Sequence, residues 1–102
     1  MRTITRKRLK EYGDAHADAR APLADWAALV KAGRWQSLDD TRRVFPHADE
    51  VRVKSGRTVT VFNIKGNRYR LIVSIHYDKQ RVFILRFLTH PEYSKDAWKE
   101  QL

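Results

Sequence analysis

Residues 62–93 read FNIKGNRYRLIVSIHYDKQRVFILRFLTHPEY, and this stretch decides the fold of the chain. From Tyr69 to Tyr77, aromatic and aliphatic side chains occupy every second position, while the positions between them are mixed. A period of two is typical of a β-strand that buries one of its faces. Residues 58–64 and 82–88 carry similar apolar runs. Three strands joined by short turns predict an antiparallel meander.

Two tight turns are expected between these strands. The first lies at Lys65-Gly66-Asn67, because glycine and asparagine tolerate the positive φ of a hairpin turn. The second lies at residues 77–80, which read YDKQ. Connections this short place consecutive strands side by side, so all three are expected in one sheet.

The N-terminal half is predicted to be mainly helical. Pro22 is placed in the first turn of its helix, where a missing N–H is tolerated. Leu23 and Trp26 lie at helical spacing and are expected to pack on the sheet as core residues. The expected bounds are an edge strand at residues 1–5, helices at residues 6–12, 17–30 and 38–44, a loop at residues 47–50, and strands at residues 51–53 and 58–64.

Several residues are expected to mark the ends of these helices. Thr5 and Ser37 have the side chains that cap helix starts, and Ser37-x-x-Asp40 has the spacing of a capping box. Gly13 and Gly33 are expected to end the first and second helices. Helices followed by a twisted antiparallel sheet predict an α+β fold.

Length and composition indicate one domain spanning residues 1–102. A hydrophobic content of 42% suffices for one modest core. The chain has no cysteine, which excludes disulfides and thiolate metal sites and suits a reducing cytoplasm. No apolar run approaches the roughly 20 residues that a bilayer requires, and no secretion signal follows the first residues. We therefore expect a soluble cytoplasmic protein with no membrane contact.

Positive charge is concentrated in the same region as the strands. The formal net charge is +9, and residues 51–90 hold nine lysines and arginines against one acid, Asp78. Arginine forks hold phosphates, and the gain in binding comes largely from counterion release. RNA is therefore a candidate partner. A solvated sheet face and an acidic protein partner are the alternatives.

His90 is the candidate acid–base group, because it directly follows the last strand and lies near arginines of the neighbouring strands. The other histidines are scattered, no metal-ligand pattern occurs and no cofactor motif is present. RNA cleavage needs no metal when the substrate's 2′-OH attacks the adjacent phosphorus, but it needs a base, an acid and cations. Histidine, with an ordinary pKa of about 6.5, can act as base or acid. A loop or capping role is the alternative.

Two motifs resemble the HigB family of bacterial toxins. Residues 61–72 read VFNIKGNRYRLI and resemble the family's FNI-x-GN-x-YRL strand pair, and residues 89–93 read THPEY and resemble its TH-x-EY motif. Residues 4–10, 21–26 and 35–37 are also similar, so the resemblance covers nearly the whole chain. It implies a RelE-like fold, in which N-terminal helices pack on a small, mainly antiparallel sheet. The implied activity is ribosome-associated, metal-independent cleavage of mRNA, which halts translation.

The matched motif positions imply a catalytic site made of His90, Arg70 and Tyr93. His90 would be the main acid–base group, Arg70 the phosphate clamp, and Tyr93 either a stacking platform for a base or a second proton donor. Asn63 and Asn67 are the remaining motif positions. They would either contact the RNA or serve as turn residues. Three basic neighbours are assigned to contact with RNA or the ribosome: Lys65, Arg68 and Arg86.

The implied partners are mRNA, the ribosome and a HigA-type helix-turn-helix antitoxin. DNA would be contacted only through the toxin–antitoxin complex. The antitoxin is expected to present acidic residues to the basic sheet or at least to cover part of it, and steric blocking of ribosome entry without contact to His90 is the alternative. Two other functions remain open on the residues alone. One is a non-catalytic RNA- or ribosome-binding module, and the other is an interaction domain that recognises an acidic protein.

Overall fold

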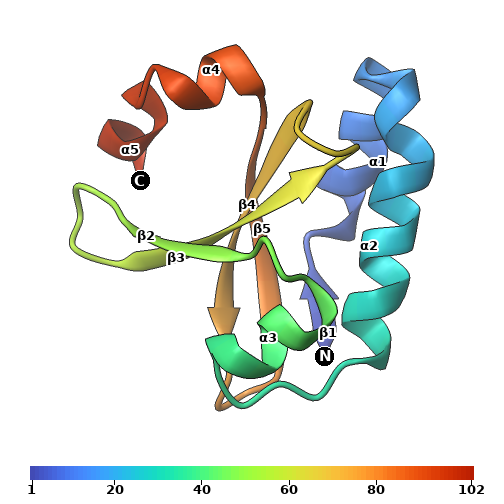
Figure 1. Ribbon diagram of the computed structural model, residues 1–102, viewed down its shortest axis with the longest axis vertical. Helices are drawn as coiled ribbons and strands as arrows, with labels where there is room; N and C mark the ends of the chain where they lie inside the picture. Colours follow the sequence, from blue (N-terminus) through green and yellow to red (C-terminus); the bar gives the residue numbers. More distant parts are fainter.

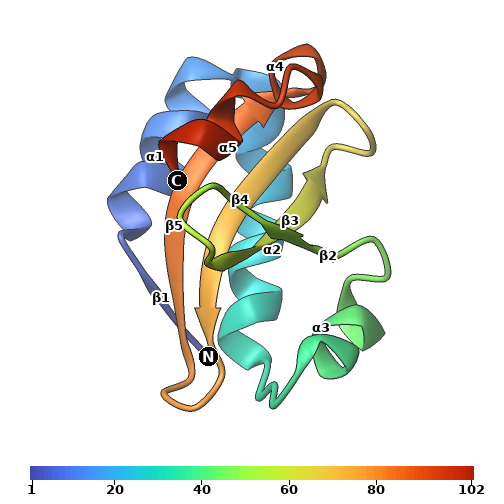
Figure 2. The same ribbon diagram turned by 90° about the vertical axis from the view of Figure 1, so that its left-hand side faces the viewer.

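The computed structural model describes residues 1–102, whose five strands form one sheet in the order β1-β5-β4-β3-β2 (Figures 1 and 2). β1 runs parallel to β5, and every other neighbouring pair is antiparallel. The predicted α+β fold and its meander are confirmed. The elements are β1 (Arg2–Ile4), α1 (Arg6–Ala15), η1 (Ala17–Ala19), α2 (Arg20–Ala32), α3 (Leu38–Val44), β2 (Asp49–Arg52), β3 (Thr58–Ile64), β4 (Tyr69–His76), β5 (Arg81–Thr89), α4 (His90–Ser94) and α5 (Ala97–Gln101).

Alternation along β4 gives the sheet two buried faces. Leu71 and Val73 point to the face covered by α1 and α2, which we call the helix face, and they share a core with Leu23 and Trp26. Ile72 points to the opposite face, which we call the C-terminal face because α4 and α5 lie over it (Figure 1). Each large side chain buried in this way contributes about 1.5–3 kcal/mol. The predicted core role of Leu23 and Trp26 is confirmed.

A β-bulge in β5 shifts the register in which β5 pairs with β4. Ile72 pairs with Arg86 while Val73 pairs with Ile84, so Leu85 has no partner in β4. Directly paired residues of an antiparallel ladder share a face. The bulge therefore sets Arg86 opposite Ile72, but its guanidinium reaches the edge of β5 beside α1, where it and Arg8 both donate to the Leu85 carbonyl, at 2.8 Å and 3.4 Å.

Several helix ends differ from the sequence-based expectation. α1 continues through Gly13 to Ala15. Gly13 is buried, and a Cβ at this position would lie only 3.4 Å from the Cα of Arg20. The glycine thus permits two helices to approach closely and does not end one. Thr5 and Ser37 precede their helices as predicted, but neither side chain caps them. Asp40 accepts a hydrogen bond from the amide of Gln36 at 2.8 Å, so the predicted capping box does not form.

The other expected boundaries are close to the observed ones. β2 begins at Asp49, inside the predicted loop at residues 47–50. α2 ends at Gly33 as predicted, although Gly33 has an extended conformation. In the first hairpin turn, positive φ occurs at Lys65 and Gly66. The expectation that Asn67 would take this conformation is wrong, since a lysine occupies it instead. None of the helices has the length and apolar character needed to cross a bilayer.

Asp18 ties η1 to the start of β4. Its carboxylate accepts a hydrogen bond from the Tyr69 hydroxyl at 2.6 Å and forms an ion pair with Arg68 at 3.3 Å. The Tyr69 hydrogen bond, followed by the charge of Arg68, lowers the pKa of Asp18. Tyr69 pairs in register with Thr89, the residue before His90. This contact therefore supports the ends of β4 and β5 from the helix face.

We predict that Asp18→Asn destabilises the protein more at pH 6 than at pH 2. A carboxyl group whose pKa is lower in the folded state stabilises the fold above its unfolded pKa of about 3.9, and this stabilisation is lost as pH falls through the lower folded value. Urea unfolding of both proteins between pH 2 and pH 6 measures the difference. A difference in the free energy of unfolding that stays constant over this range would contradict the assignment.

Candidate functional site

Arg70 lies on the C-terminal face, at the end of β4 nearest to α4. Its partners in register are Asn63 on β3 and Leu88 on β5, so both share this face. The neighbouring residues Tyr69 and Leu71 point into the helix-face core. Strand alternation thus separates the arginine from the main core and directs it toward the short helices that follow β5.

The guanidinium of Arg70 is buried without an acidic partner. The residue is 8% exposed, and no aspartate or glutamate forms an ion pair with it. Nη1 donates to the carbonyl oxygens of Asn67 at 3.1 Å and Tyr69 at 3.2 Å, and Nη2 donates to the Asn67 side-chain oxygen. Neutral acceptors orient the group but leave its charge uncompensated. A buried cation of this kind favours an anion beside it.

His90 places an imidazole against this cation. Its Nδ1 lies 3.3 Å from Nη2 of Arg70, and the residue itself is exposed. A guanidinium can only donate hydrogen bonds, so Nδ1 acts as the acceptor and the proton of the neutral ring lies on Nε2. The two groups predicted to work together are therefore in contact.

A capping box holds His90 at the first position of α4. The Thr89 side chain accepts from the Glu92 amide at 3.3 Å, and the Glu92 carboxylate accepts from the Thr89 amide at 2.9 Å. The backbone hydrogen bond from Thr89 is the main reason that the pKa of Glu92 is lowered. This reciprocal pair satisfies two amides at the helix start and fixes the direction in which the chain leaves β5. His90 is therefore the start of a helix, not a loop residue.

Tyr93 completes the cluster one turn after His90. Its ring lies 5.4 Å from the guanidinium carbon of Arg70 and stacks on Trp98, with ring centroids 5.3 Å apart. Trp98 is buried, and its indole nitrogen donates to the Tyr93 carbonyl at 3.1 Å. Burial raises the pKa of Tyr93, so its hydroxyl keeps its proton at neutral pH.

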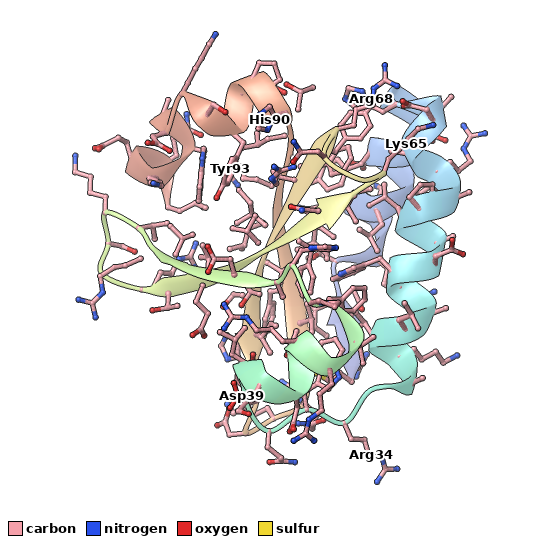
Figure 3. The ribbon with its side chains drawn as sticks, in the orientation of Figure 1. Arg34, Asp39, Lys65, Arg68, His90 and Tyr93 are labelled. Carbon is pink, nitrogen blue, oxygen red and sulfur yellow. The ribbon has the colours of Figure 1, made fainter.

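The remaining predicted residues fall into two groups. Asn67 contacts Arg70, and Asn63 shares the face of Arg70 by strand register, whereas the guanidinium of Arg86 lies at the edge of β5 beside Arg8 of α1. Arg86 has no acidic partner, and its Nη1 donates to the carbonyl of Leu85 at 2.8 Å. Arg68 and Lys65 are not part of this cluster: Arg68 pairs with Asp18, and Figure 3 shows both side chains toward α2, away from His90 and Tyr93.

The cluster lies at the surface of the sheet, and neither of the two main hollows of the molecule contains it. Those hollows are lined by residues of α1, α2 and the first strand. No three histidine, aspartate or glutamate side chains lie close enough together to hold a metal ion. What the cluster offers chemically is a fixed cation that has an imidazole and the ring of a protonated phenol beside it. This set suits binding of a phosphate and transfer of protons next to it.

Comparison with known proteins identifies the family. Residues 19–96 match the model of the HigB_toxin family, described as the RelE-like toxic component of a toxin–antitoxin system. The chain belongs to the HigB toxin family. This match confirms the resemblance expected from the two sequence motifs, and it includes Arg70, His90 and Tyr93.

Three proteins named HigB are similar to this chain over most of their length. The mRNA interferase toxin HigB of Escherichia coli strain K12 is 26% identical over 93 residues, which cover 91% of this chain and 88% of the relative. The proteins named mRNA interferase HigB in Escherichia coli O157:H7 and Shigella flexneri match with the same values. The RelE-like description of the HigB family agrees with the observed arrangement of helices on a mainly antiparallel sheet.

Two residues important to this HigB-family site were missed by sequence reasoning. The Trp98 ring stacks on the Tyr93 ring, and the Glu92 side chain completes the capping box with Thr89. Thr89-x-x-Glu92 is the spacing of a capping box and was visible in the sequence. Trp98 is a large aromatic residue in an otherwise polar segment, which is a signal that it anchors this segment to the core. Trp98 lies just beyond the residues matched by the family.

Proposed function

We propose that this chain is an mRNA interferase, the toxic enzyme of a type II toxin–antitoxin pair, and that it cleaves mRNA without a metal ion. The observation that carries the proposal is the contact between Arg70 and His90. A buried guanidinium without a carboxylate partner lies 3.3 Å from an exposed imidazole, at a surface open to a polymer. The similar HigB proteins are named mRNA interferases, and this supports the same reaction.

Arg70 binds the scissile phosphate in this mechanism. Negative charge builds on the phosphoryl oxygens as the attacking oxygen adds, and a fixed guanidinium stabilises this charge more in the transition state than in the substrate. When a phosphate oxygen takes the hydrogen bond of Nη2, Nδ1 of His90 loses its present donor. Substrate binding thereby frees the lone pair that a general base requires.

His90 and Tyr93 then move the two protons. His90 Nδ1 removes the proton of the substrate's 2′-OH, the 2′-oxygen forms a bond to phosphorus, and the bond from phosphorus to the 5′-oxygen breaks. The raised pKa of Tyr93 keeps its hydroxyl protonated, so it acts as the donor to the departing oxygen and not as the base. The products are a 2′,3′-cyclic phosphate and a 5′-hydroxyl, and solvent returns the protons.

The proposal also names the binding partners of the protein and the compartment in which it acts. Cleavage takes place on mRNA bound to the ribosome, in the cytoplasm. Asn63 and Asn67 contact the RNA beside the cleaved phosphate, and Arg86 contacts the RNA or the ribosome. A HigA-type helix-turn-helix antitoxin neutralises the toxin, and DNA is contacted only through their complex. The positive charge of residues 51–90 supports the RNA and ribosome contacts, and the family's toxin–antitoxin description supports the antitoxin.

Mapping of cleavage sites with His90→Ala as the control tests the function. Purified protein is added to an mRNA with and without translating ribosomes, and the 5′ ends of the fragments are determined by primer extension. We expect fragments that depend on ribosomes, and a rate about 10²- to 10⁴-fold lower for His90→Ala, because loss of a general base has an effect of this size. Binding to ribosomes without fragments would instead show a non-catalytic binding module.

A further inference from the structure

The edge of β5 that faces α1 has no strand beside it beyond the end of β1. β1 pairs only with residues 81–83 of β5. Figure 2 shows α1 beside the following part of β5, on the side away from β4. Nη1 of Arg8 donates to the carbonyls of Ile84 at 2.8 Å and Leu85 at 3.4 Å. Side chains of α1 therefore take the place of a strand along this part of the edge.

Two guanidiniums meet at this edge without a counter-ion. Nη1 of Arg86 donates to the Leu85 carbonyl at 2.8 Å, and Nη1 of Arg8 approaches the same oxygen at 3.4 Å. Neither arginine forms an ion pair, and neither donates a hydrogen bond from Nε or Nη2. We call Arg8 and Arg86 the arginine pair. Its free donors match the oxygens of a phosphate, and an anion between the two cations relieves their repulsion.

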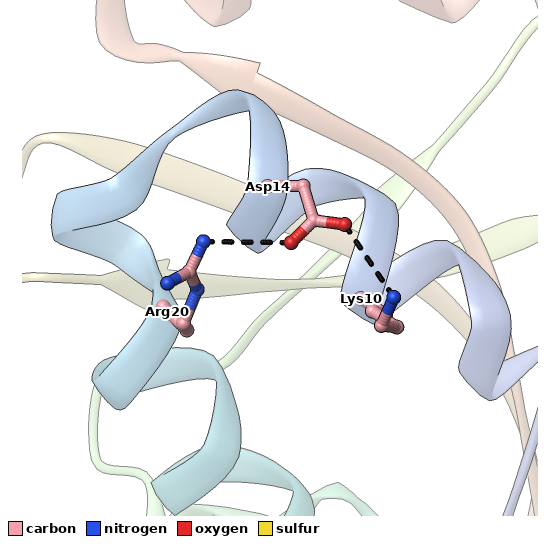
Figure 4. Close-up of polar contacts among 3 residues, drawn as sticks. All are labelled: Lys10, Asp14 and Arg20. Atoms are coloured by element: carbon pink, nitrogen blue, oxygen red, sulfur yellow. Dashed lines mark hydrogen bonds and ion pairs between the residues drawn. The ribbon is translucent and has the colours of Figure 1, made fainter.

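The acids of α1 do not neutralise the arginine pair. Asp14 is held by Lys10 at 3.8 Å and by Arg20, the first residue of α2, at 3.4 Å (Figure 4). Glu11 is exposed and forms no ion pair with either member of the arginine pair. The positive charge at the edge of β5 is therefore available to a ligand.

Tyr12 places an aromatic ring next to the arginine pair. It lies one turn after Arg8 on α1, and its ring stacks on Phe87 of β5 with centroids 5.1 Å apart. Burial raises the pKa of Tyr12, while the charges of Arg8 and Arg86 act in the opposite direction, so both cations lie near its hydroxyl. The tyrosine is partly exposed. Cations for the backbone and an aromatic ring for a base are the combination that holds single-stranded RNA.

The arginine pair lies close to Arg70 along the sheet. Arg86 precedes Leu88 by two residues, and Leu88 pairs in register with Arg70. With about 3.4 Å per residue along a strand and about 4.8 Å between strands, the backbones of Arg86 and Arg70 are about 8 Å apart. An RNA strand that leaves Arg70 and passes over β5 therefore reaches the arginine pair within a few nucleotides.

We infer that the arginine pair and Tyr12 form a second RNA subsite, which holds a phosphate of the mRNA a few nucleotides from the cleaved bond and stacks a base beside it. The guanidiniums bind the phosphate oxygens through their free Nε and Nη2 groups, and the Tyr12 ring contacts the neighbouring base. That the strand is the mRNA substrate rests on the proposed function, whereas the recognition of a phosphate and a base does not. The subsite gives a protein whose Arg70 cluster lies outside its main hollows a second hold on a long substrate.

Binding of a non-cleavable RNA by matched variants tests the inference. The probe is a fluorescein-labelled single-stranded RNA of about 12 nucleotides, whose 2′-O-methyl groups replace the hydroxyls that attack phosphorus. Arg8→Gln/Arg86→Gln removes the charge of the arginine pair. Its control, Arg2→Gln/Arg81→Gln, removes two exposed arginines that pair in register near the other end of β5 and have no acidic partner. Fluorescence anisotropy measures affinity between about 50 and 200 mM salt.

Two further variants test the role of the Tyr12 ring. Tyr12→Leu keeps an apolar side chain against Phe87 but removes the ring, whereas Tyr12→Phe keeps the ring and removes only the hydroxyl. Circular dichroism confirms that every variant is folded. Cosedimentation with ribosomes that carry no mRNA shows whether ribosomal RNA, and not mRNA, occupies the subsite.

We expect Arg8→Gln/Arg86→Gln to bind the RNA about tenfold more weakly at low salt, with a salt slope smaller by about 0.7, the value for one phosphate contact. Tyr12→Leu should bind about fivefold more weakly or worse. Tyr12→Phe and the Arg2/Arg81 control should bind nearly as wild type does, and binding to ribosomes without mRNA should not change.

Wild-type affinity in the arginine-pair variant or in Tyr12→Leu would overturn the inference, and so would an equal loss in the Arg2/Arg81 control or no binding of the probe by the wild-type protein. A loss confined to ribosome binding would also overturn it, because the contact would then be with ribosomal RNA. The probe cannot be cleaved, so failure of the proposed cleavage activity would leave this result interpretable.

Discussion

Arg70→Met should reduce mRNA cleavage about 10²- to 10³-fold while it raises the free energy of unfolding by about 1 kcal/mol. The loss of activity follows from removal of the charge that stabilises the transition state. The gain in stability follows because Arg70 is 8% exposed and has no carboxylate partner, so folding takes its charge out of water without a counter-ion. Methionine fills a similar volume without that cost. Asn67 is exposed, so water can replace the bonds that it loses, while the buried Tyr69 carbonyl also loses a donor and reduces the gain.

Cleavage assays and urea unfolding measure the two effects of Arg70→Met. Arg81→Met is the matched control, because Arg81 is an exposed cation on β5 without an acidic partner, at the end of the strand away from His90. We expect the control to change neither quantity strongly. Wild-type cleavage by Arg70→Met would show that the catalytic site lies elsewhere. A large loss of stability would show that the hydrogen bonds of the guanidinium outweigh the cost of burying its charge.

Trp98→Ala should lower the free energy of unfolding by about 3–5 kcal/mol and also reduce cleavage by the molecules that remain folded. Trp98 is 4% exposed and anchors the C-terminal segment in the smaller core with Ile72 and Val61. Its ring is the surface on which Tyr93 stacks, and its indole holds the Tyr93 carbonyl. Without this support α4 loses its position, and His90 and Tyr93 lose their alignment with Arg70.

Trp35→Ala separates these two effects of Trp98. Trp35 is equally buried, at 3% exposed, but it belongs to the helix-face core. We expect a similar loss of stability with unchanged cleavage per folded molecule at a temperature where both variants are folded. Trp98→Phe should restore cleavage because it keeps a ring beneath Tyr93. Equal loss of cleavage in the Trp35 and Trp98 variants would mean that Trp98 acts only through global stability.

Sequence reasoning succeeded where the alternation along one strand, or the pairing of two consecutive strands, determines where a side chain lies. The alternation from Tyr69 to Tyr77 correctly predicts that Tyr69 and Leu71 face the main core, and so places Arg70 on the other face. His90 follows the strand adjacent to β4, so its closeness to Arg70 follows from the antiparallel pairing. The fold class and the arrangement of the meander depend on similar local rules.

The features that sequence reasoning missed depend on contacts between distant segments. The bulge at Leu85 has no periodic signature, yet it decides which residue of β4 pairs with Arg86. Gly13 has the pattern of a helix end, but its role depends on how closely Arg20 approaches. Ser37-x-x-Asp40 has a capping spacing like that of Thr89-x-x-Glu92, and only the latter forms. Glutamate is one methylene longer than aspartate, which helps its carboxylate reach back to the first amide.

The order of the segments along the chain has a consequence for synthesis. His90, Tyr93 and Trp98 all come after the fifth strand, so a growing chain can present every strand of the sheet before it presents the acid–base group or its support. A chain cut directly after β5 therefore keeps every strand of the sheet but lacks the acid–base group and the side chains that hold it.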